Sequence, residues 1–451
     1  MPTAALITLG CKVNQYDTQA MQEVMLRNGY TVVGENDPAD VCIINTCTVT
    51  NAADQKARQV IRRAIRKNPE TEVLVTGCYA ESDREAIAAI PGVSLVFGNR
   101  EKADLQKYLD LVHESWHEKD RLPLLQIEPI HHDAIREHAN FSMSVSEAGK
   151  HTRALIKVQD GCSAFCTYCI IPYVRGRMTS RPLSDIVQEA EKIAANGYKE
   201  IVITGVHLGA YGLDIGRQTT IADILEHIHP IDGIERIRFS SIEAMNFPPD
   251  LVDRMAALPK CMPHFHLPLQ AGSDKILRQM RRRYTKAEFS RLVGKLRISF
   301  PNVGITTDIM VGFPGETDAD FEDSLQYVEE IGFSQLHVFR YSPRRGTPAA
   351  DYADHVPPHV SAERSKAMIA LGKQLGTNFR KRMLGKTMNV LVEDSREGTD
   401  GHLAGFTENY LRVLTDVTDS EVNRILPARL TALEGEFIRV ETIPTPFNSN
   451  L

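Results

Sequence analysis

Three cysteines crowd into one short segment near the middle of the chain. Cys162, Cys166 and Cys169 lie within "GCSAFCTYC" (161–169), between the apolar runs "ALIKVQD" and "IIPYV". Clustered thiolates are typical of metal sites, and a structural zinc ion takes four ligands. No fourth cysteine or histidine follows in the neighbouring sequence. The segment therefore predicts either an iron–sulfur cluster with one iron lacking a protein ligand, or a zinc site that a distant residue completes.

An iron without a protein ligand can bind a small molecule through an amine and a carboxylate. The cysteine loop follows a strand-like run, so we expect it at the C-terminal end of a strand. Later strand-like runs are followed in the same way by polar or glycine-containing segments, which supply Gly205, Glu243, Gln270 and Asp308. Because the C-terminal ends of parallel strands form the active sites of barrels, we expect these residues to lie near the cysteine loop.

A second set of cysteines lies in the N-terminal part of the chain. Cys11 ends "LITLGC", Cys47 ends "VCIINTC" and Cys78 ends "EVLVTGC", so each follows a strand-like run directly. Parallel strands bring their C-terminal ends to one edge of a sheet, which predicts that these three thiols converge. Cys42 lies inside its run and Cys261 has no partner nearby, and we expect both to be structural thiols.

The elements that must position these residues fall into segments of different pattern. Residues 1–112 alternate apolar runs with helical spacing, which predicts an open parallel α/β domain. Residues 151–375 hold six strand–helix units, as in a partial (β/α)6 barrel. Residues 380–443 show period-two alternation, which predicts a small all-β barrel. The expected parallel strands are 4–10, 41–46, 72–77 and 94–99 in the first segment, and 153–159, 200–205, 236–241, 264–269, 305–312 and 335–341 in the second.

The stretch 113–150 is polar and has no sustained periodicity, which is typical of a linker. It is rich in histidine, but the spacing of these residues matches no common ligand pattern. The histidines are His113, His117, His131, His132 and His138.

Composition restricts the class of protein. The chain has 451 residues, of which 42% are hydrophobic and 24% charged, as in globular proteins of several domains. It has no apolar run near the roughly 20 residues that span a bilayer, and "MPTAALITLGC" lacks the basic start of a secretory signal. We therefore expect a cytoplasmic protein with no membrane association. Because disulfides are rare in the cytoplasm, the eight cysteines favour metal sites.

The formal net charge is −6, so RNA binding would depend on local basic patches. The candidates are Arg175, Arg177, Arg181, residues 278–286, Arg344, Arg345 and residues 380–382. Two alternative roles for these basic residues stay open. They can lie on solvated faces of helices, or they can contact the carboxylate of the small molecule bound at the open iron.

Taken together, the motifs resemble the radical S-adenosylmethionine (SAM) methylthiotransferases over nearly the whole chain. They are "LGCKVNQYDTQ", "INTCTVT", "VTGCYAE", "GCSAFCTYCIIPYVRGRMTSRP", "HLPLQAGSDKIL" and "DIMVGFPGET". The terminal barrel resembles a TRAM RNA-binding domain. The resemblance implies a radical SAM 4Fe–4S cluster on Cys162, Cys166 and Cys169, and an auxiliary 4Fe–4S cluster on Cys11, Cys47 and Cys78. It further implies SAM as methyl donor and radical source, with Tyr168, Gly205, Glu243, Gln270 and Asp308 around it.

The family has three main branches, and "GCKVNQYDTQ" resembles the one that acts on threonylcarbamoyladenosine. The isopentenyl branch tends to have Gln-Met-Asn where this chain has Lys12, Val13 and Asn14. The resemblance thus implies conversion of N6-threonylcarbamoyladenosine at position 37 of tRNA, 3′ of the anticodon, to its 2-methylthio derivative. The implied partners are the tRNA anticodon stem-loop, a low-potential electron donor such as a flavodoxin, and sulfide or a sulfur carrier.

Three alternatives remain open at this point. The substrate can instead be N6-isopentenyladenosine in tRNA or an aspartate of a ribosomal protein, and the negative net charge fits a protein substrate. The third alternative is that the chain is a non-catalytic iron–sulfur protein that binds RNA. Such a protein needs no open iron, and four cysteines for each cluster would favour it.

Overall fold

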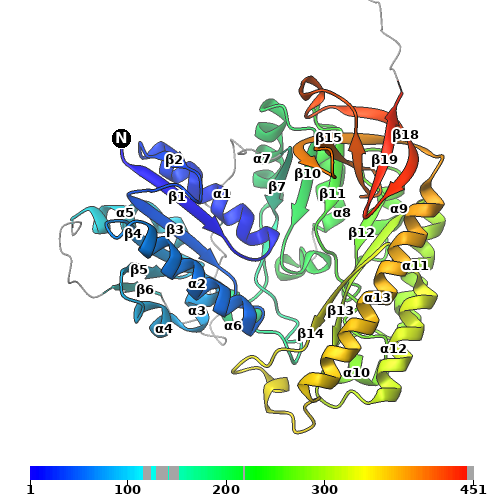
Figure 1. Cartoon of the computed structure of the whole chain (residues 1–451), viewed down its shortest axis with the longest axis horizontal. Coiled ribbons are helices and arrows are strands. Elements are labelled where there is room, and N and C mark those ends of the chain that lie inside the picture. The colour runs from blue at the N-terminus through cyan, green and yellow to red at the C-terminus, as the bar shows by residue number, and fades with distance from the viewer. Residues whose placement is uncertain (115–122, 128–140, 142–151, 217–218, 444–451) are drawn as a thin grey trace, which may run out of the picture.

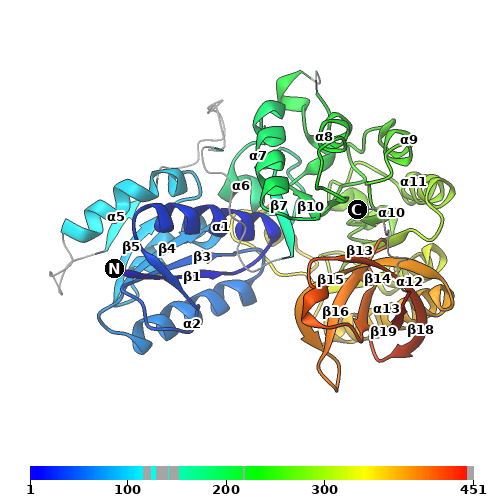
Figure 2. The same ribbon diagram turned by 90° about the horizontal axis from the view of Figure 1, so that it is seen from above.

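The computed structural model describes residues 1–114, 123–127, 141, 152–216 and 219–443. An N-terminal domain, a larger middle domain and a small C-terminal barrel pack together, coloured blue, green to yellow, and orange to red in Figure 1. Seen from above, the N-terminal domain lies on one side and the other two parts on the opposite side (Figure 2). Within the described ranges, each helix is too short or too polar to cross a membrane.

The N-terminal domain is built around a parallel sheet with the strand order β2-β1-β3-β4-β5-β6. The expected strands at 41–46 and 72–77 coincide with β3 and β4, while the edge strands β2 and β6 are too short to give a sequence pattern. The strands are β1 (Thr3–Thr8), β2 (Thr31–Val33), β3 (Val41–Thr46), β4 (Glu72–Gly77), β5 (Val93–Phe97) and β6 (Leu124–Gln126).

The stretch expected to be a linker contributes β6, which pairs with β5 through main-chain hydrogen bonds. His113 lies in the last turn of α5 (Leu105–Glu114). The other histidines of this stretch, His117, His131, His132 and His138, lie outside the described residues.

Helices cover both faces of the N-terminal sheet. α1 (Lys12–Arg27) and α5 bury apolar side chains on one face, and α5 follows the 3-10 helix η1 (Glu101–Asp104). α2 (Asn51–Lys67), α3 (Cys78–Ser82) and α4 (Arg84–Ala88) cover the other face. Leu155 and Val202 of the middle domain belong to the first of these apolar clusters, so α1 packs between the two domains.

The middle domain is a partial barrel of six parallel strands, as the sequence predicts. β11-β10-β7 and β12-β13-β14 are two three-stranded sheets, and a bridge from Ile237 to Cys261 joins them beside β11 and β12. β7 and β14 are therefore the open edges. The strands are β7 (Arg153–Lys157), β10 (Glu200–Thr204), β11 (Arg236–Phe239), β12 (His264–His266), β13 (Gly304–Val311) and β14 (Gln335–Arg340), with a small antiparallel pair, β8 (Gln159–Asp160) and β9 (Thr179–Ser180).

Helices lie outside these strands and share one apolar core with them. Thr285 and Thr317 begin α11 and α12 with reciprocal side-chain and main-chain hydrogen bonds to Glu288 and Asp320. The helices are α6 (Ile171–Arg175), α7 (Leu183–Ala195), α8 (Ile221–Ile228), α9 (Leu251–Ala256), α10 (Asp274–Gln279), α11 (Lys286–Ser299) and α12 (Asp318–Ile331), with 3-10 turns η2 (Leu208–Ala210), η3 (Leu213–Ile215) and η4 (Pro348–Asp351).

The C-terminal part is the expected closed β-barrel, reached through the long helix α13 (Pro358–Met383). It docks on the middle domain, where the guanidinium groups of Arg236 and Arg238 on β11 donate to main-chain oxygens of Phe406 and Glu408. Its strand order is β15-β16-β17-β19-β18, with β15 (Thr387–Glu397), β16 (His402–Thr407), β17 (Arg412–Thr415), η5 (Asp419–Glu421), β18 (Ile425–Glu434) and β19 (Phe437–Thr442).

Candidate functional site

The N-terminal cysteines come together at the C-terminal edge of their sheet. Cys11 follows β1, Cys47 follows β3 and Cys78 begins α3 directly after β4. All three line one cavity. Cys42, by contrast, is buried in the apolar core beneath the sheet, as expected of a structural thiol. The parallel topology thus brings three thiols from distant parts of the sequence to one place.

Two glycines make this convergence possible. Gly10 has φ of 104°, and a Cβ atom built there would lie only 2.7 Å from Cβ of Cys47. Gly77 has φ of 99°, and its Cβ would lie 2.4 Å from the main-chain oxygen of Thr46. Any side chain at either position would collide with the neighbouring loop as well as strain the backbone. The pair Gly-Cys in "LGC" and "TGC" is therefore needed for the cysteine loops to approach each other.

Side-chain amides hold these loops in place. The amide nitrogen of Asn14 on α1 donates to the main-chain oxygens of Leu9 and Thr46, at 2.8 and 3.0 Å. Burial raises the pKa of Cys47 to about 12 and also raises that of Cys78, and neighbouring thiols add to both effects. Thiols of this kind stay protonated when no metal is bound, and they release their protons when a metal ion binds and stabilises the thiolate. The donor set and its fixed loops therefore fit a metal cluster.

The second cysteine set occupies a tight loop between β8 and α6. The N–H of Cys169 donates to the carbonyl of Cys166 at 2.9 Å, and the N–H of Cys162 donates to that of Gly176 at 3.0 Å. Burial raises the pKa of Cys162 to about 11 and raises that of Cys169 further, with their neighbouring thiols contributing. Arg282 also approaches, with Nη1 3.6 Å from Sγ of Cys166. This loop fits a metal cluster for the same reasons as the first set.

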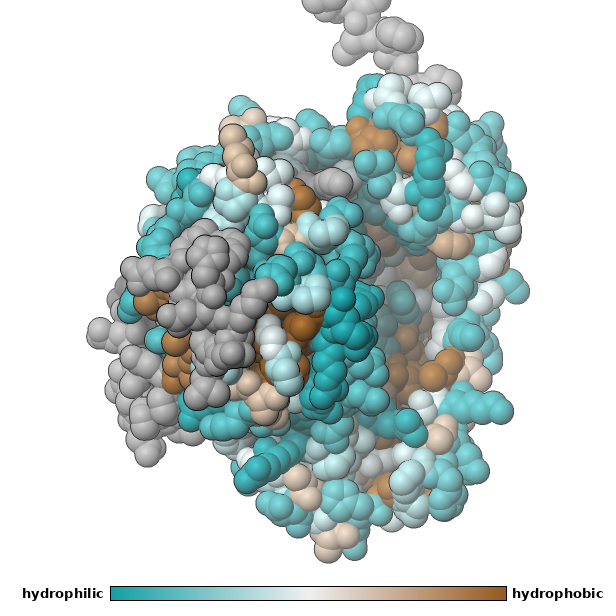
Figure 3. Space-filling model, turned by 60° about the vertical axis from the view of Figure 1, so that its left-hand side comes forward, coloured by the Kyte–Doolittle hydropathy of each residue, from teal (hydrophilic) through white to brown (hydrophobic). Residues whose placement is uncertain are grey.

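A cavity of about 1370 Å³ lies where the three parts of the protein meet. Figure 3 shows the hydrophilic outer face of the molecule and a hollow within it where hydrophobic side chains are visible. The volume of the cavity exceeds the ~300–1,000 Å³ of most small-molecule sites, so the cavity has room for more than one ligand. Of the predicted site residues, those that line it are Cys11, Cys47, Cys78, Gly205, Glu243, Gln270 and Asp308.

The remaining predicted residues lie next to this cavity rather than on its described walls. Glu243 forms an ion pair with Arg282, and Arg282 contacts Cys166, so one buried arginine connects the cavity to the second cysteine loop. Tyr168 packs against the apolar core of the barrel, and burial raises its pKa. The two cysteine sets thus lie near the same space, since Cys78 also packs against Ile170 and Val174, which follow the second cysteine loop.

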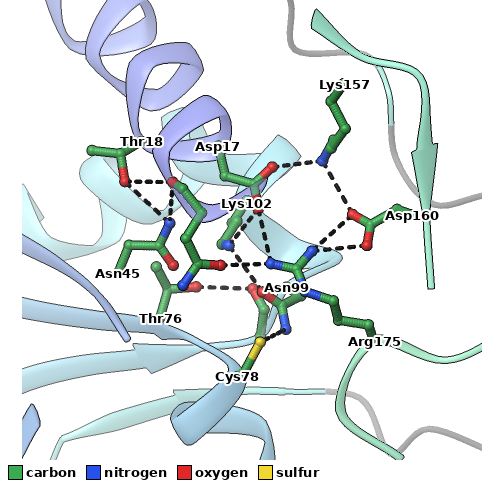
Figure 4. Close-up of polar contacts among 12 residues, drawn as sticks. Asp17, Thr18, Asn45, Thr76, Cys78, Asn99, Lys102, Lys157, Asp160 and Arg175 are labelled. Atoms are coloured by element: carbon green, nitrogen blue, oxygen red, sulfur yellow. Dashed lines mark hydrogen bonds and ion pairs between the residues drawn. The ribbon is translucent and has the colours of Figure 1, made fainter. Parts of the chain in front are cut away.

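Buried charges join the two domains beside Cys78 (Figure 4). Asp17 on α1 contacts Lys102 at 2.9 Å and Lys157 of β7 at 2.5 Å, so the second contact crosses the domain boundary. Arg175 completes the group 3.5 Å from the same carboxylate. Burial alone would raise the pKa of Asp17, but these three cations hold it well below its usual range. Asp17 is therefore charged at neutral pH and is the common counter-ion of the group.

Arg175 links this group to both cysteine sets. It lies in α6, directly after the second cysteine loop, and its Nη1 binds both oxygens of Asp160 at 2.8 and 2.9 Å. Its Nη2 donates to Oδ1 of Asn14 at 2.6 Å, and its positive charge counteracts the rise that burial causes in the pKa of Cys78. Among the described residues, Lys102, Lys157 and Arg175 form ion pairs with two carboxylates, Asp17 and Asp160. The surplus positive charge beside Cys78 complements the negative charge of thiolates.

The phosphate-binding role expected of several arginines is wrong. Arg175, Arg181 and Arg344 are buried and ion-paired, because each neutralises a carboxylate inside the protein or between its parts. Arg282, within the basic stretch 278–286, is buried in the same way. Local charge density in a sequence does not distinguish such internal ion pairs from a surface patch.

One polar cluster in the cavity was predicted only in part, because the sequence indicated Asp308 but neither of the two histidines beside it. His266 Nε2 and His337 Nδ1 each lie 3.3 Å from Oδ1 of Asp308. Asp308 and His337 are register partners on β13 and β14, and His266 pairs with Thr306 two residues before Asp308. The alternation of "HFH" and "QLHVF" places these histidines on the face of Asp308, but only the pairing register brings them together.

Two family models match the chain, one in each of the first two domains. Residues 3–98 match the uncharacterized protein family UPF0004, and residues 156–328 match the radical SAM superfamily. Among solved structures, the radical SAM methyltransferase TsrM from Kitasatospora setae has a TM-score of 0.55 at 15% identity and covers 77% of this chain and 77% of its own. At that identity the likeness indicates a shared fold.

Curated relatives match over nearly the full length. The threonylcarbamoyladenosine tRNA methylthiotransferase MtaB of Bacillus subtilis (strain 168) is 38% identical over 448 residues, which cover 98% of this chain and 97% of that protein. The tRNA-2-methylthio-N(6)-dimethylallyladenosine synthase of Pelotomaculum thermopropionicum is 35% identical and covers 94% of each chain. Together with the two sets of three cysteines, one lining the cavity and the other in a loop beside it, these matches show that the chain belongs to the radical SAM methylthiotransferases, enzymes that use SAM and 4Fe–4S clusters.

Proposed function

We propose that this protein converts N6-threonylcarbamoyladenosine at position 37 of tRNA to 2-methylthio-N6-threonylcarbamoyladenosine. Relatives named for the threonylcarbamoyl nucleoside are 36–38% identical, and those named for the dimethylallyl nucleoside are 32–35% identical. This gap is too small to decide between the two substrates. A tRNA substrate implies action in the cytoplasm, with a low-potential electron donor and a source of sulfide as partners.

The observation that carries the choice of substrate is the polar wall of the cavity formed by β12–β14 and α13. The threonylcarbamoyl group has a carboxylate, a hydroxyl and an amide, whereas the isopentenyl group is a hydrocarbon. Burying polar side chains against a hydrocarbon leaves them without hydrogen bonds, at a cost of ~1–3 kcal/mol for each group. The polar residues of this wall are His264, His266, Gln270, Thr306, Asp308, Ser334, Gln335, His337, Lys373, Thr377 and Arg380.

We infer that each cysteine set holds one 4Fe–4S cluster. Cys162, Cys166 and Cys169 would hold the radical SAM cluster, and Cys11, Cys47 and Cys78 the auxiliary cluster. With SAM and a reductant, these groups supply the radical that activates the adenosine C–H bond and the sulfur that replaces its hydrogen. The protein's own contribution is to keep both cysteine sets and the substrate around one cavity, through the glycine-dependent loops and the buried ion pairs.

The C-terminal barrel contributes part of the same cavity. Phe406 and Tyr410 stack with ring centroids 4.4 Å apart, and Arg153 and Arg412 lie over the Phe406 ring at 4.6 and 4.5 Å. Both arginines also form ion pairs with Glu393, so these side chains make a packed part of the cavity wall where the barrel meets the middle domain.

Replacing Glu243 by glutamine is expected to weaken SAM binding by about 10- to 100-fold, because a carboxylate that receives an amine contributes ~1.5–3 kcal/mol. Glu243 lines the cavity beside Arg282, next to Cys166. Equilibrium binding of SAM to the cluster-loaded protein measures the effect, with iron content as a check on the clusters. Glu226→Gln, at a surface ion pair, is the matched control. An unchanged dissociation constant would contradict the assignment of Glu243.

The substrate is tested by nucleoside mass spectrometry of total tRNA from cells that lack the gene, with and without the restored gene. We expect 2-methylthio-N6-threonylcarbamoyladenosine to disappear and then return. If only the isopentenyl methylthio nucleoside responds, the choice of branch is wrong although the chemistry is right. If neither responds, an RNA substrate is wrong and a ribosomal-protein aspartate is the next candidate.

A further inference from the structure

The cluster of His266, Asp308 and His337 lies on the cavity wall and is built to meet a ligand. Both imidazoles contact the same carboxylate oxygen, Oδ1 of Asp308, at 3.3 Å. Although burial alone would raise it, these two contacts hold the pKa of Asp308 well below its usual range. Oδ1 is therefore occupied, whereas Oδ2 of this anionic carboxylate has no hydrogen-bond partner in the described part of the chain and remains for a donor from the cavity.

The rings of the two histidines differ in freedom. Nδ1 of His266 contacts Oγ1 of Thr306 at 2.8 Å, so this ring is fixed at both nitrogens and is buried. The side chain of His337 is 54% exposed and uses only Nδ1 toward Asp308. No described residue pairs with Nε2 of His337, so this ring nitrogen is left for the cavity. A neutral ring accepts there, and a cationic ring donates to a carboxylate.

A second observation indicates a polar ligand at the same wall. Gln270 is 6% exposed and lies beside Asp308, since its N–H donates to the Asp308 carbonyl at 2.8 Å. Its side-chain oxygen is buried, and among the described residues it has no hydrogen-bond partner. Buried polar atoms in native proteins are normally paired, so a cavity ligand is the expected partner.

We propose that His337, Asp308 and Gln270 bind the polar end of the N6 substituent and so select threonylcarbamoyladenosine over isopentenyladenosine. Asp308 would accept from the hydroxyl or carbamoyl N–H, and His337 would meet the hydroxyl or carboxylate. His266 positions Asp308. This inference rests on the proposed function, and it replaces the SAM contacts predicted for Gln270 and Asp308.

The selection works by penalty as well as by attraction. A threonylcarbamoyl group satisfies the carboxylate, the imidazole and the amide, whereas an isopentenyl group would bury all three without partners. Sites built around hydrogen bonds reject analogues that lack the polar groups more strongly than apolar pockets reject polar ones. The cluster therefore disfavours the hydrocarbon substrate even though the cavity is large enough for it.

The test compares anticodon stem-loop RNAs that carry either threonylcarbamoyl- or isopentenyladenosine at position 37, using the cluster-loaded protein. In His337→Asn the shorter side-chain amide can replace Nδ1 but does not reach the position of Nε2. In His337→Gln the longer side-chain amide reaches the position of Nε2 and keeps a donor toward the cavity. We expect His337→Asn to lower kcat/KM for the threonylcarbamoyl RNA by about 10- to 100-fold. His337→Gln should retain activity on the threonylcarbamoyl RNA within about 3-fold of the wild type, because it keeps a donor toward the cavity. His359→Ala, at an exposed histidine on α13, is the matched control.

Equal activity of His337→Asn and wild type on the threonylcarbamoyl RNA would overturn the inference while leaving the proposed function intact. Wild-type activity on the isopentenyl RNA alone would overturn the proposed function and the inference with it. A third outcome concerns a cation, since two histidines and a carboxylate are also metal ligands. Stoichiometric zinc with nitrogen and oxygen neighbours in X-ray absorption, lost in His337→Asn, would assign the cluster to metal binding instead.

Discussion

Replacing Cys47 by alanine is expected to abolish methylthiolation while 5′-deoxyadenosine continues to form. Cys47 lies beneath Gly10 and beside Cys78, in the set assigned to the auxiliary cluster, and it is remote in sequence from the loop assigned to SAM cleavage. Loss of one thiolate of three leaves too few ligands for a stable cluster. We expect product formation to fall at least 100-fold and iron content to fall by about half.

The measurement is product and 5′-deoxyadenosine in one anaerobic assay, together with iron content and the electron paramagnetic resonance of the reduced protein. Cys42→Ala is the matched control, because it removes a thiol five residues earlier that lies in the apolar core. That variant should lose only the ~1 kcal/mol or so of a small core cavity and keep both products. Methylthiolated RNA from Cys47→Ala would exclude a role for this set in sulfur transfer.

Replacing Asp17 by alanine is expected to lower the free energy of unfolding by about 3–5 kcal/mol, the usual cost of breaking a buried ion pair. Asp17 is almost fully buried and is the common counter-ion of Lys102, Lys157 and Arg175. Its removal leaves Asp160 as the partner of Lys157 and Arg175, and it takes from Lys102 the carboxylate with which that lysine is paired in the described part of the chain. Since Lys157 and Arg175 belong to the middle domain, the contact between the domains should weaken as well.

Chemical denaturation of the anaerobic, cluster-loaded protein measures this loss. Asp419→Ala is the matched control, because its pair with Arg396 is exposed and should be worth less than about 1 kcal/mol. The pKa of Asp17 lies below that of an unfolded aspartate, near 3.9, so its contribution is complete above that pH and is lost as the pH falls below it. If the denaturation midpoint of Asp17→Ala equals that of Asp419→Ala at neutral pH within error, a stabilising role of Asp17 is contradicted.

We also expect Asp17→Ala to reduce methylthiolation more than 5′-deoxyadenosine formation, because only methylthiolation needs the two domains in their correct relative position.

Much of the fold was accessible from the sequence because local patterns and topology agree. The runs at 41–46 and 72–77 are strands to the residue, since both are short, β-branched and bounded by turn residues. The short strands β2 and β6 were not predicted, because a strand of three residues that depends on pairing with its neighbour has no periodic pattern in the sequence. The C-terminal barrel was recognisable as a type, yet its strand order depends on long-range pairing.

The sequence by itself determined the chemistry of this protein: two sets of three cysteines, each following strands, and the motifs of a radical SAM methylthiotransferase. Only the tertiary structure decided what the charged residues do. Arg175 and Arg181 look like phosphate ligands in the sequence, but burial and nearby carboxylates make them internal ion pairs. The cluster of His266, Asp308 and His337 likewise exists only because three strands align in one register. Residue type and spacing specify which reactions are possible, whereas burial, pairing and register depend on residues far apart in the chain.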